Sequence, residues 1–90
     1  MDVIKKDGSR QAFSRDKIET SVRNTSLDIR EGVSDRDVNL ITDDVVRELK
    51  KLRGTEGTTS IHEIRMLTAL AIRSFGYEKI ANHYIKDIFE

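Results

Sequence analysis

The first eighteen residues, MDVIKKDGSRQAFSRDKI (Met1–Ile18), decide the fold of this chain. Asp7-Gly8 lies between two short stretches of mixed polarity, which indicates a β-hairpin, because Asp and Gly best tolerate the positive φ of a type I′ turn. The predicted strands cover residues 2–6 and 10–13, and alternation places Val3 and Lys5 on one face. A two-stranded ribbon is not stable alone in water, so the hairpin must lie on the rest of the chain.

From Ser14 onward the apolar residues follow the period of a helix. Ser14 is a suitable N-cap for a first helix that begins near Arg15 and reaches Asn24 or beyond. Ser34 caps a second helix that ends at Gly54. One face of this second helix is expected to be buried, because its apolar residues step by three or four positions: Val38, Ile41, Val45, Leu49 and Leu52.

The last third of the chain predicts two more helices. Ser60 and Glu63 have the spacing of a capping box, so a third helix starts there and stops at Gly76. A fourth helix covers about residues 77–88, and Phe75, Tyr77 and Tyr84 are expected in the core. The preceding Gly57-Thr58-Thr59 segment is a candidate third edge strand beside the hairpin. Together these elements predict an α+β fold, in which a small antiparallel β-sheet of two to three strands lies on a four-helix bundle, as a single domain over residues 1–90.

Composition limits the classes of function. The 90 residues carry 16 basic and 16 acidic side chains, and this formal net charge of zero argues against a global basic field for nucleic acid or anionic membranes. The sequence contains no cysteine, which excludes disulfides, thiolate zinc sites and thiol catalysis. It has neither a long apolar run nor a signal-peptide pattern, so we expect a cytoplasmic protein without membrane contact.

Several cationic and hydroxyl side chains could meet around a polyphosphate. Lys5 and Lys6 lie on the hairpin, Lys17 in the first turn of the first helix, and Thr58 and His62 at the start of the third helix, where free N–H groups favour anions. Each feature also has a simpler interpretation as an edge-strand lysine that opposes aggregation, a helix cap or a surface histidine. No Walker-type loop, metal-ligand spacing or nucleophile–base pair appears, so neither catalysis nor a protein-bound metal is expected.

The same stretches resemble the ATP-cone family. Its opening motif is similar to Val3-Ile4-Lys5-Lys6-Asp7-Gly8 followed by Phe13 and Asp16-Lys17-Ile18, and its entry into the third long helix is similar to the segment 58–63. The closing element resembles residues 76–81 with Tyr84-Ile85. The resemblance implies a three-stranded sheet over a four-helix bundle that binds ATP or dATP. It also implies regulation of ribonucleotide reductases or of their genes.

Carried over position by position, the resemblance implies a nucleotide site with Mg²⁺ bridging the phosphates. Val3, Lys5 and Lys6 would line the nucleotide, and Lys17 would hold phosphate. Ile18 would support the base, while Thr58 and His62 would contact the nucleotide from the third helix. Gln11 and Ser14 occupy two further positions at which some reductase members contact the nucleotide. The full set is therefore Val3, Lys5, Lys6, Gln11, Ser14, Lys17, Ile18, Thr58 and His62.

The expected function is that of a non-enzymatic regulatory module. ATP or dATP would sit between the hairpin and the helices and control an associated protein or its oligomerisation, the partner being a second copy, a ribonucleotide reductase or a regulator. Direct nucleic-acid binding by the isolated domain is not expected. The alternative is a helical protein-interaction or DNA-binding accessory module with weak or lost nucleotide binding, which Asp87 favours because a carboxylate near a triphosphate would repel it.

Overall fold

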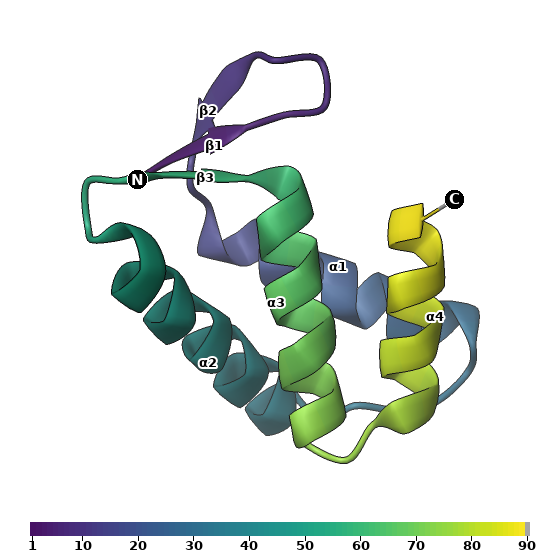
Figure 1. The fold of residues 1–90 in the computed structure, drawn as a ribbon. Helices are drawn as coiled ribbons and strands as arrows, with labels where there is room; N and C mark the ends of the chain where they lie inside the picture. The colour runs from purple at the N-terminus through teal and green to yellow at the C-terminus, as the bar shows by residue number, and fades with distance from the viewer. Residues whose placement is uncertain (90) are drawn as a thin grey trace.

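The computed structural model describes the backbone of residues 1–89 and the side chains of residues 1–86. Its elements follow the order β1 (Asp2–Ile4), β2 (Arg10–Ala12), α1 (Arg15–Asp28), α2 (Asp35–Arg53), β3 (Thr58–Ser60), α3 (Ile61–Ser74) and α4 (Glu78–Phe89). Figure 1 shows the sheet at one end of the helical layer, with β3 running directly into α3. The predicted α+β class and the four predicted helices are confirmed within the described residues.

The sheet is mixed rather than antiparallel throughout, which corrects the prediction. Its order is β2-β1-β3, so β1 is the central strand and the candidate third strand does form beside the hairpin. β1 pairs with β2 antiparallel but with β3 in parallel. The parallel pairing follows from the connection between the strands. After β2 the chain passes through α1 and α2 and returns to the end of the sheet at which β1 begins, so β3 runs in the same direction as β1.

The hairpin closes with a different turn from the one predicted. Gly8 donates its N–H to the Lys5 carbonyl at 3.0 Å, and Lys5 donates to Ser9 at 2.8 Å, which leaves a three-residue loop over residues 6–8. Within the hairpin only Gly8 has positive φ, 85°, as in a type I turn closed by a left-handed glycine. The Asp7 carboxylate accepts hydrogen bonds from the side chain and backbone of Ser9, which lower the pKa of Asp7.

The central strand directs one side chain into the helices. Val3 is 2% exposed and lies opposite Gln11 on one side and Thr59 on the other. Residues directly opposite each other share a face of a sheet, so all three point toward the helical layer. Thr58 pairs with Asp2 and therefore points to the outer face.

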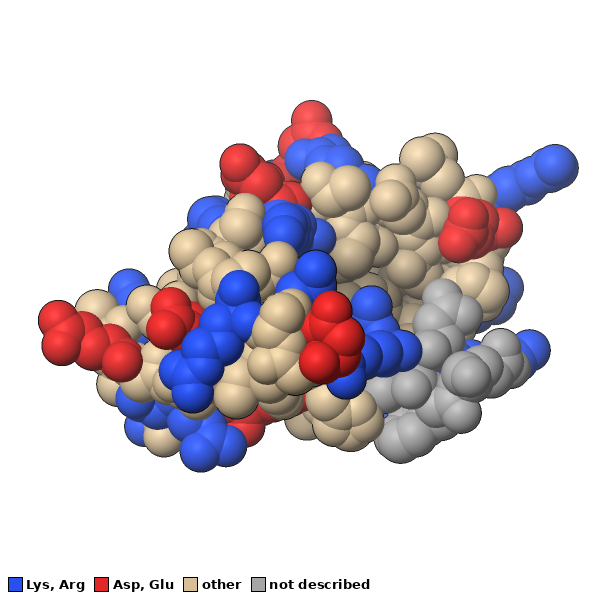
Figure 2. Space-filling view, turned by 90° about the horizontal axis from the view of Figure 1, so that it is seen from above, with Lys and Arg blue, Asp and Glu red and all other residues tan. Residues whose placement is uncertain are grey.

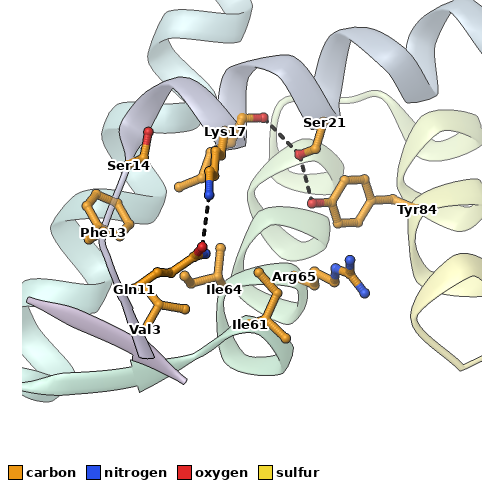
Figure 3. A pocket seen from close by; sticks show the side chains of 11 residues that line it. Val3, Gln11, Phe13, Ser14, Lys17, Ser21, Ile61, Ile64, Arg65 and Tyr84 are labelled. Carbon is orange, nitrogen blue, oxygen red and sulfur yellow. Dashed lines mark hydrogen bonds between the residues drawn. The ribbon is translucent and has the colours of Figure 1, made fainter. Parts of the chain in front are cut away.

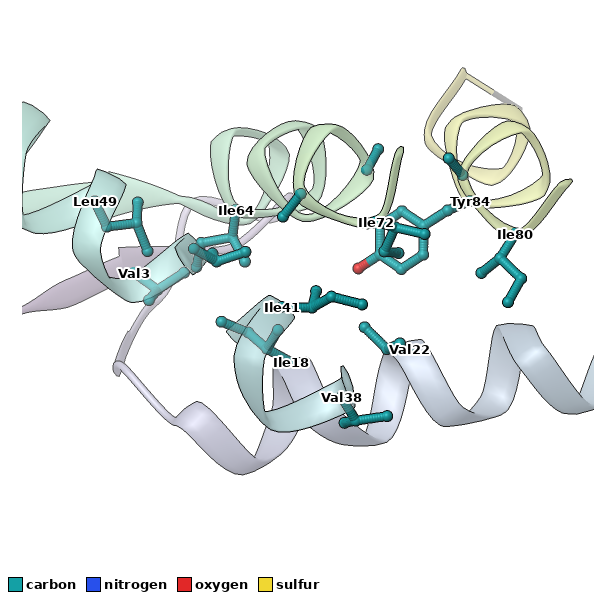
Figure 4. Close-up of a cluster of buried hydrophobic side chains, with 14 residues drawn as sticks. Val3, Ile18, Val22, Val38, Ile41, Leu49, Ile64, Ile72, Ile80 and Tyr84 are labelled. Carbon is teal, nitrogen blue, oxygen red and sulfur yellow. The ribbon is translucent and has the colours of Figure 1, made fainter. Parts of the chain in front are cut away.

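The core lies between the sheet and the four described helices. Figure 4 shows the cluster, which includes Val3 from the sheet and aliphatic side chains from all four described helices. The most enclosed members have at most 2% exposure: Val3, Val22, Val38, Ile41, Val45, Leu49, Ala69, Ile72, Ile80 and Ala81. Tyr84 is buried and Tyr77 packs against the cluster, as the sequence predicts. None of the described helices has both the length and the apolar character needed to cross a membrane.

Two apolar residues expected inside are instead exposed, and both lie at helix ends. Leu52 shares the angular position of the buried stripe of α2 but is 57% exposed. Phe75 follows the last residue of α3 and is 38% exposed. Helical periodicity fixes the direction of a side chain but not whether a neighbouring element covers it, and residues 50–56 are all exposed around Leu52.

A charged cluster fixes the junction between β3 and α3. Ser60 caps α3 by accepting from the Glu63 N–H at 3.0 Å, which is the expected half of the capping box. The Glu63 carboxylate, however, accepts from Arg53 Nε at 3.0 Å, from Arg53 Nη2 at 2.7 Å and from Thr59 Oγ1 at 2.7 Å. Arg53 and then Thr59 lower the pKa of Glu63, so one carboxylate ties the end of α2 to β3.

The two leucines near the end of α2 give a matched pair for stability. Leu49→Ala should lower the free energy of unfolding by about 2–5 kcal/mol, because the substitution leaves a cavity in the core. Leu52→Ala should change it by less than about 0.5 kcal/mol, because its site is open to water. Urea unfolding followed by circular dichroism measures both, and equal losses would contradict the packing described here.

The Glu63 cluster predicts a dependence of stability on pH. Since the folded-state pKa of Glu63 lies below its ordinary value, its stabilising effect is complete above that ordinary value and disappears as the pH falls through the folded one. Glu63→Gln should therefore lower the Tm at pH 7, and the difference from the wild type should shrink between about pH 5 and pH 3. Glu56→Gln, in the exposed loop before β3, is the control and should leave the Tm unchanged. A constant difference across this range would overturn the assignment.

Candidate functional site

A cavity of about 200 Å³ opens between the helix-facing side of the sheet and three helices. Figure 3 shows side chains from the hairpin, α1, α3 and α4 converging on it. The lining consists of Val3, Gln11, Phe13, Ser14, Lys17, Ile18, Ser21, Ile61, Ile64, Arg65 and Tyr84.

The inner walls are apolar and largely rigid. Val3, Ile18 and Ile64 are buried members of the core, and Phe13 and Ile61 pack against that core. Side chains of this kind offer a flat, dry surface to a ring or another apolar group. The sheet and α1 supply one side of this surface and α3 supplies the other.

The cavity also has two cations and no carboxylate. Lys17 donates from Nζ to Gln11 Oε1 at 2.9 Å, a bond that leaves its charge without an acidic partner. Among the described residues no side chain pairs with the guanidinium of half-buried Arg65. None of the described lining side chains is acidic, although the chain as a whole is neutral. The lining therefore has a formal charge of +2 and favours an anion.

The start of α1 adds hydrogen-bond donors to the same cavity. Ser14 has the extended backbone of an N-cap, but its side chain makes no cap hydrogen bond, contrary to the simple capping interpretation. The first N–H groups of a helix have no partner within the helix, and the helix dipole makes that end positive. The Ser14 hydroxyl and the first turn of α1 are thus available to a ligand.

Two hydroxyls close the side of the cavity next to α4. Ser21 donates to the Ile18 carbonyl at 2.9 Å, and the oxygens of Ser21 and Tyr84 lie 3.0 Å apart. Since the single Ser21 proton points to the carbonyl, the Tyr84 hydroxyl is the donor in this second bond. The pair joins α1 to α4 and holds the Tyr84 ring beside the cavity (Figure 3).

Five of the nine site residues predicted from the sequence line this cavity: Val3, Gln11, Ser14, Lys17 and Ile18. The other four do not. Lys5 and Lys6 lie at the exposed hairpin end, where the sheet has already stopped, and Thr58 is exposed on the outer face. His62 is exposed in the first turn of α3 and has an interaction within the protein. Asp87 lies outside the residues whose side chains are described. Binding roles at these positions remain predictions.

Sequence reasoning assigned no site role to Phe13, to Ser21 or to the residues of α3 and α4 that line the cavity. Phe13 was noted as part of a motif, but the other missed residues are Ser21, Ile61, Ile64, Arg65 and Tyr84. One signal was present: Arg65 follows Ile61 by four positions, so a cation shares a helix face with an inward-pointing residue. Tyr84 was correctly expected in the core, and its ring edge also borders the cavity.

The lining offers little to a metal ion. Magnesium is usually bound through one or two carboxylates together with phosphate oxygens and water. The oxygens of this lining belong to Gln11, Ser14, Ser21 and Tyr84, none of which is charged. Within the described residues no group of three or more His, Cys, Asp or Glu side chains could hold a metal. The described lining residues therefore offer no carboxylate for direct magnesium binding.

Comparison with known proteins agrees with the geometry. A search of curated proteins found no match to this chain. The family model for the ATP cone domain matches residues 1–86, nearly the whole chain. ATP-cone domains are regulatory modules that bind ATP or dATP. The match covers the hairpin and every described residue that lines the cavity, and we conclude that this chain belongs to the ATP-cone family of nucleotide-binding regulatory domains.

Proposed function

We propose that the cavity between the sheet and α1, α3 and α4 binds ATP or dATP and that the bound nucleotide controls an associated protein or self-association. The observation that carries this proposal is the charge of the lining, whose described residues include two cations and no carboxylate in a chain of zero net charge. Such a lining attracts a multiply charged anion, and its apolar walls suit a planar base.

The burial of the lining suggests how the nucleotide lies. A cavity of about 200 Å³ is smaller than the roughly 300–1,000 Å³ of typical ligand pockets, so it would hold the base and part of the sugar only. Val3, Ile18 and Ile64 are buried and would contact the base, whereas Lys17 is exposed and Arg65 half-buried. The phosphates would then lie at the opening, near these two cations. Lys5 and Lys6 could reach them from the hairpin end.

Lys17 would exchange its partner when the ligand binds. Its bond to Gln11 joins a cation to a neutral amide oxygen, whereas a phosphate oxygen would pair the same cation with a negative charge. Gln11 would then be released to contact the base or sugar. Because Gln11 lies on β2 and Lys17 on α1, this exchange would alter the tie between hairpin and helices, which offers a physical route from the ligand to the surface of the domain.

The proposal predicts that Lys17 and Arg65 both contribute to the affinity for nucleotide. Lys17→Ala and Arg65→Ala should each weaken binding of ATP and dATP by about tenfold or more, because each removes a charge-assisted hydrogen bond worth roughly 1.5–3 kcal/mol. Lys51→Ala is the matched control, since it removes one charge from the far end of α2, and it should bind as the wild type does. Isothermal titration calorimetry with ATP, dATP and GTP measures all three variants. If the wild-type protein gives no heat of binding at millimolar nucleotide, the proposal is wrong.

The uncharged oxygens of the lining predict a weak role for magnesium. We expect the affinity for ATP to change by less than about tenfold between excess Mg²⁺ and excess EDTA, because any Mg²⁺ would be held by phosphate and water. The same calorimetric titration in the two buffers tests this expectation. Complete loss of binding in EDTA would show that the protein contributes ligands to the metal.

A separate measurement of the molecular mass in solution tests the regulatory part of the proposal. Light scattering with and without nucleotide should show a change in association state, or a change in affinity for an added partner such as a ribonucleotide reductase or a transcription regulator. An association state that is unaffected by saturating nucleotide, in the absence of any partner effect, would favour the alternative of a simple interaction module.

A further inference from the structure

A second charged hollow lies away from the nucleotide cavity, between the end of α1 and the outer side of α4. Its volume is about 590 Å³, and the two sites share no residue. It is lined by Ile29, Arg30, Glu31, Lys79, Asn82, His83 and Lys86. We refer to it as the α1–α4 groove.

The groove has a cationic lining because α4 has two distinct faces. The inward face carries Ile80, Ala81 and Tyr84, all of them buried. The groove residues of α4 have the spacing i, i+3, i+4 and i+7, so they form one continuous stripe of polar side chains: Lys79, Asn82, His83 and Lys86. At 1.5 Å per residue this stripe extends about 10 Å along the helix.

Arg30 completes the groove from the end of α1. Arg30 has φ of 55°, and within the described residues it is the one non-glycine with positive φ. The backbone there follows the usual helix-ending motif, since Arg30 donates to Leu27 at 3.1 Å and Glu31 donates to Ser26 at 3.0 Å. Glycine is the residue that normally fills this position without strain. The chain instead places a cationic side chain there, at backbone strain, and that side chain lines the groove.

The charges of the groove are only partly neutralised. Among the described lining residues Glu31 is the one carboxylate, alongside Arg30, Lys79 and Lys86, and Lys86 has an interaction within the protein. His83 lies 3.9 Å from Asp28, which joins α4 to the last turn of α1. Among the described residues no side chain pairs with the guanidinium of Arg30 or the ammonium of Lys79. Figure 2 shows one face of the molecule, on which basic and acidic side chains are interspersed.

We propose that the α1–α4 groove is a second anion site that binds a chain of phosphate groups through Arg30 and Lys79. The length of the polar stripe suits several phosphates in a row better than a single one. Arg30 offers a planar fork that can bind two oxygens at once, and Lys79 adds a compact charge in the first turn of α4. The ligand is a polyphosphate, either free or as the backbone of a single-stranded nucleic acid.

Arg30→Gly separates ligand binding from a structural role. Glycine relieves the left-handed strain, so this variant should have an unchanged or higher Tm and yet bind phosphate more weakly. If Arg30 had only a structural role, its replacement would weaken binding only by destabilising the fold, and the Tm would fall as well. Lys79→Ala tests the other side of the groove, and Lys51→Ala, which lowers the total charge equally, is the control.

The experiment is a titration of the ¹⁵N-labelled chain with inorganic tripolyphosphate at low salt, followed by NMR. The backbone signals of residues 29–31 and 79–83 should move, and Arg30→Gly with Lys79→Ala together should weaken this binding by tenfold or more. Lys51→Ala should leave it within about twofold. Unmoved groove signals, an unaffected double variant, or an equal loss in the control would each overturn the proposal.

Two further arms keep this site apart from the nucleotide cavity and identify its ligand. In the Lys17→Ala variant the backbone signals of the groove should still move on addition of tripolyphosphate, so the result does not depend on nucleotide binding in the cavity. If the groove signals no longer move in this variant, the proposal is wrong. A short oligothymidylate should be bound through the same two residues if nucleic acid is the source. Tighter binding of tripolyphosphate per phosphate group would instead assign the groove to a free polyphosphate.

Discussion

The parallel pairing of β1 with β3 is the contact on which the rest of the structure depends. It joins the first residues of the chain to the start of α3, and each paired strand is only three residues long. Strands this short are not stable by themselves, so their position relies on Val3 in the core and on the Glu63 cluster at the junction. Because the hairpin also carries Gln11, the same pairing places one wall of the cavity opposite α1 and α3.

Separation of charge gives this neutral chain its two distinctive surfaces. Lys17 and Arg65 face a cavity without carboxylates, and Arg30 and Lys79 lie in a groove where basic side chains outnumber acidic ones. Some other charges are paired, as between Arg15 and Asp43 at 2.6 Å or between Lys51 and Glu48 at 3.4 Å. Pairs of this exposed kind add little stability, so the unpaired cations at the hollows are the more informative feature. Total charge therefore says little about which ligands such a domain attracts.

The site was predictable where it depends on local sequence and unpredictable where it depends on packing. Val3, Gln11, Ser14, Lys17 and Ile18 lie within sixteen residues, and alternation followed by a helix start brings them together. Arg65 and Tyr84 come from distant helices, and their position depends on how α3 and α4 pack against α1. The sequence placed Thr58 in the site, but in the structure its neighbour Thr59 points toward the helices. The register of β3 alone decides which of the two points inward, and a shift of one residue exchanges them.

The sequence by itself determined the helices and their inward faces, the presence of a hairpin and the family resemblance, because these depend on short-range periodicity, turn residues and caps. The tertiary structure decided the parallel pairing of β3, the three-residue turn at Gly8, the exposure of Leu52 and the cationic groove between α1 and α4. Apart from the turn, which is local, each of these depends on how segments far apart in the chain are arranged. The opening stretch Met1–Ile18 shows both levels: its residues specify a hairpin and a helix start, but only the packing of α3 and α4 beneath them makes a cavity.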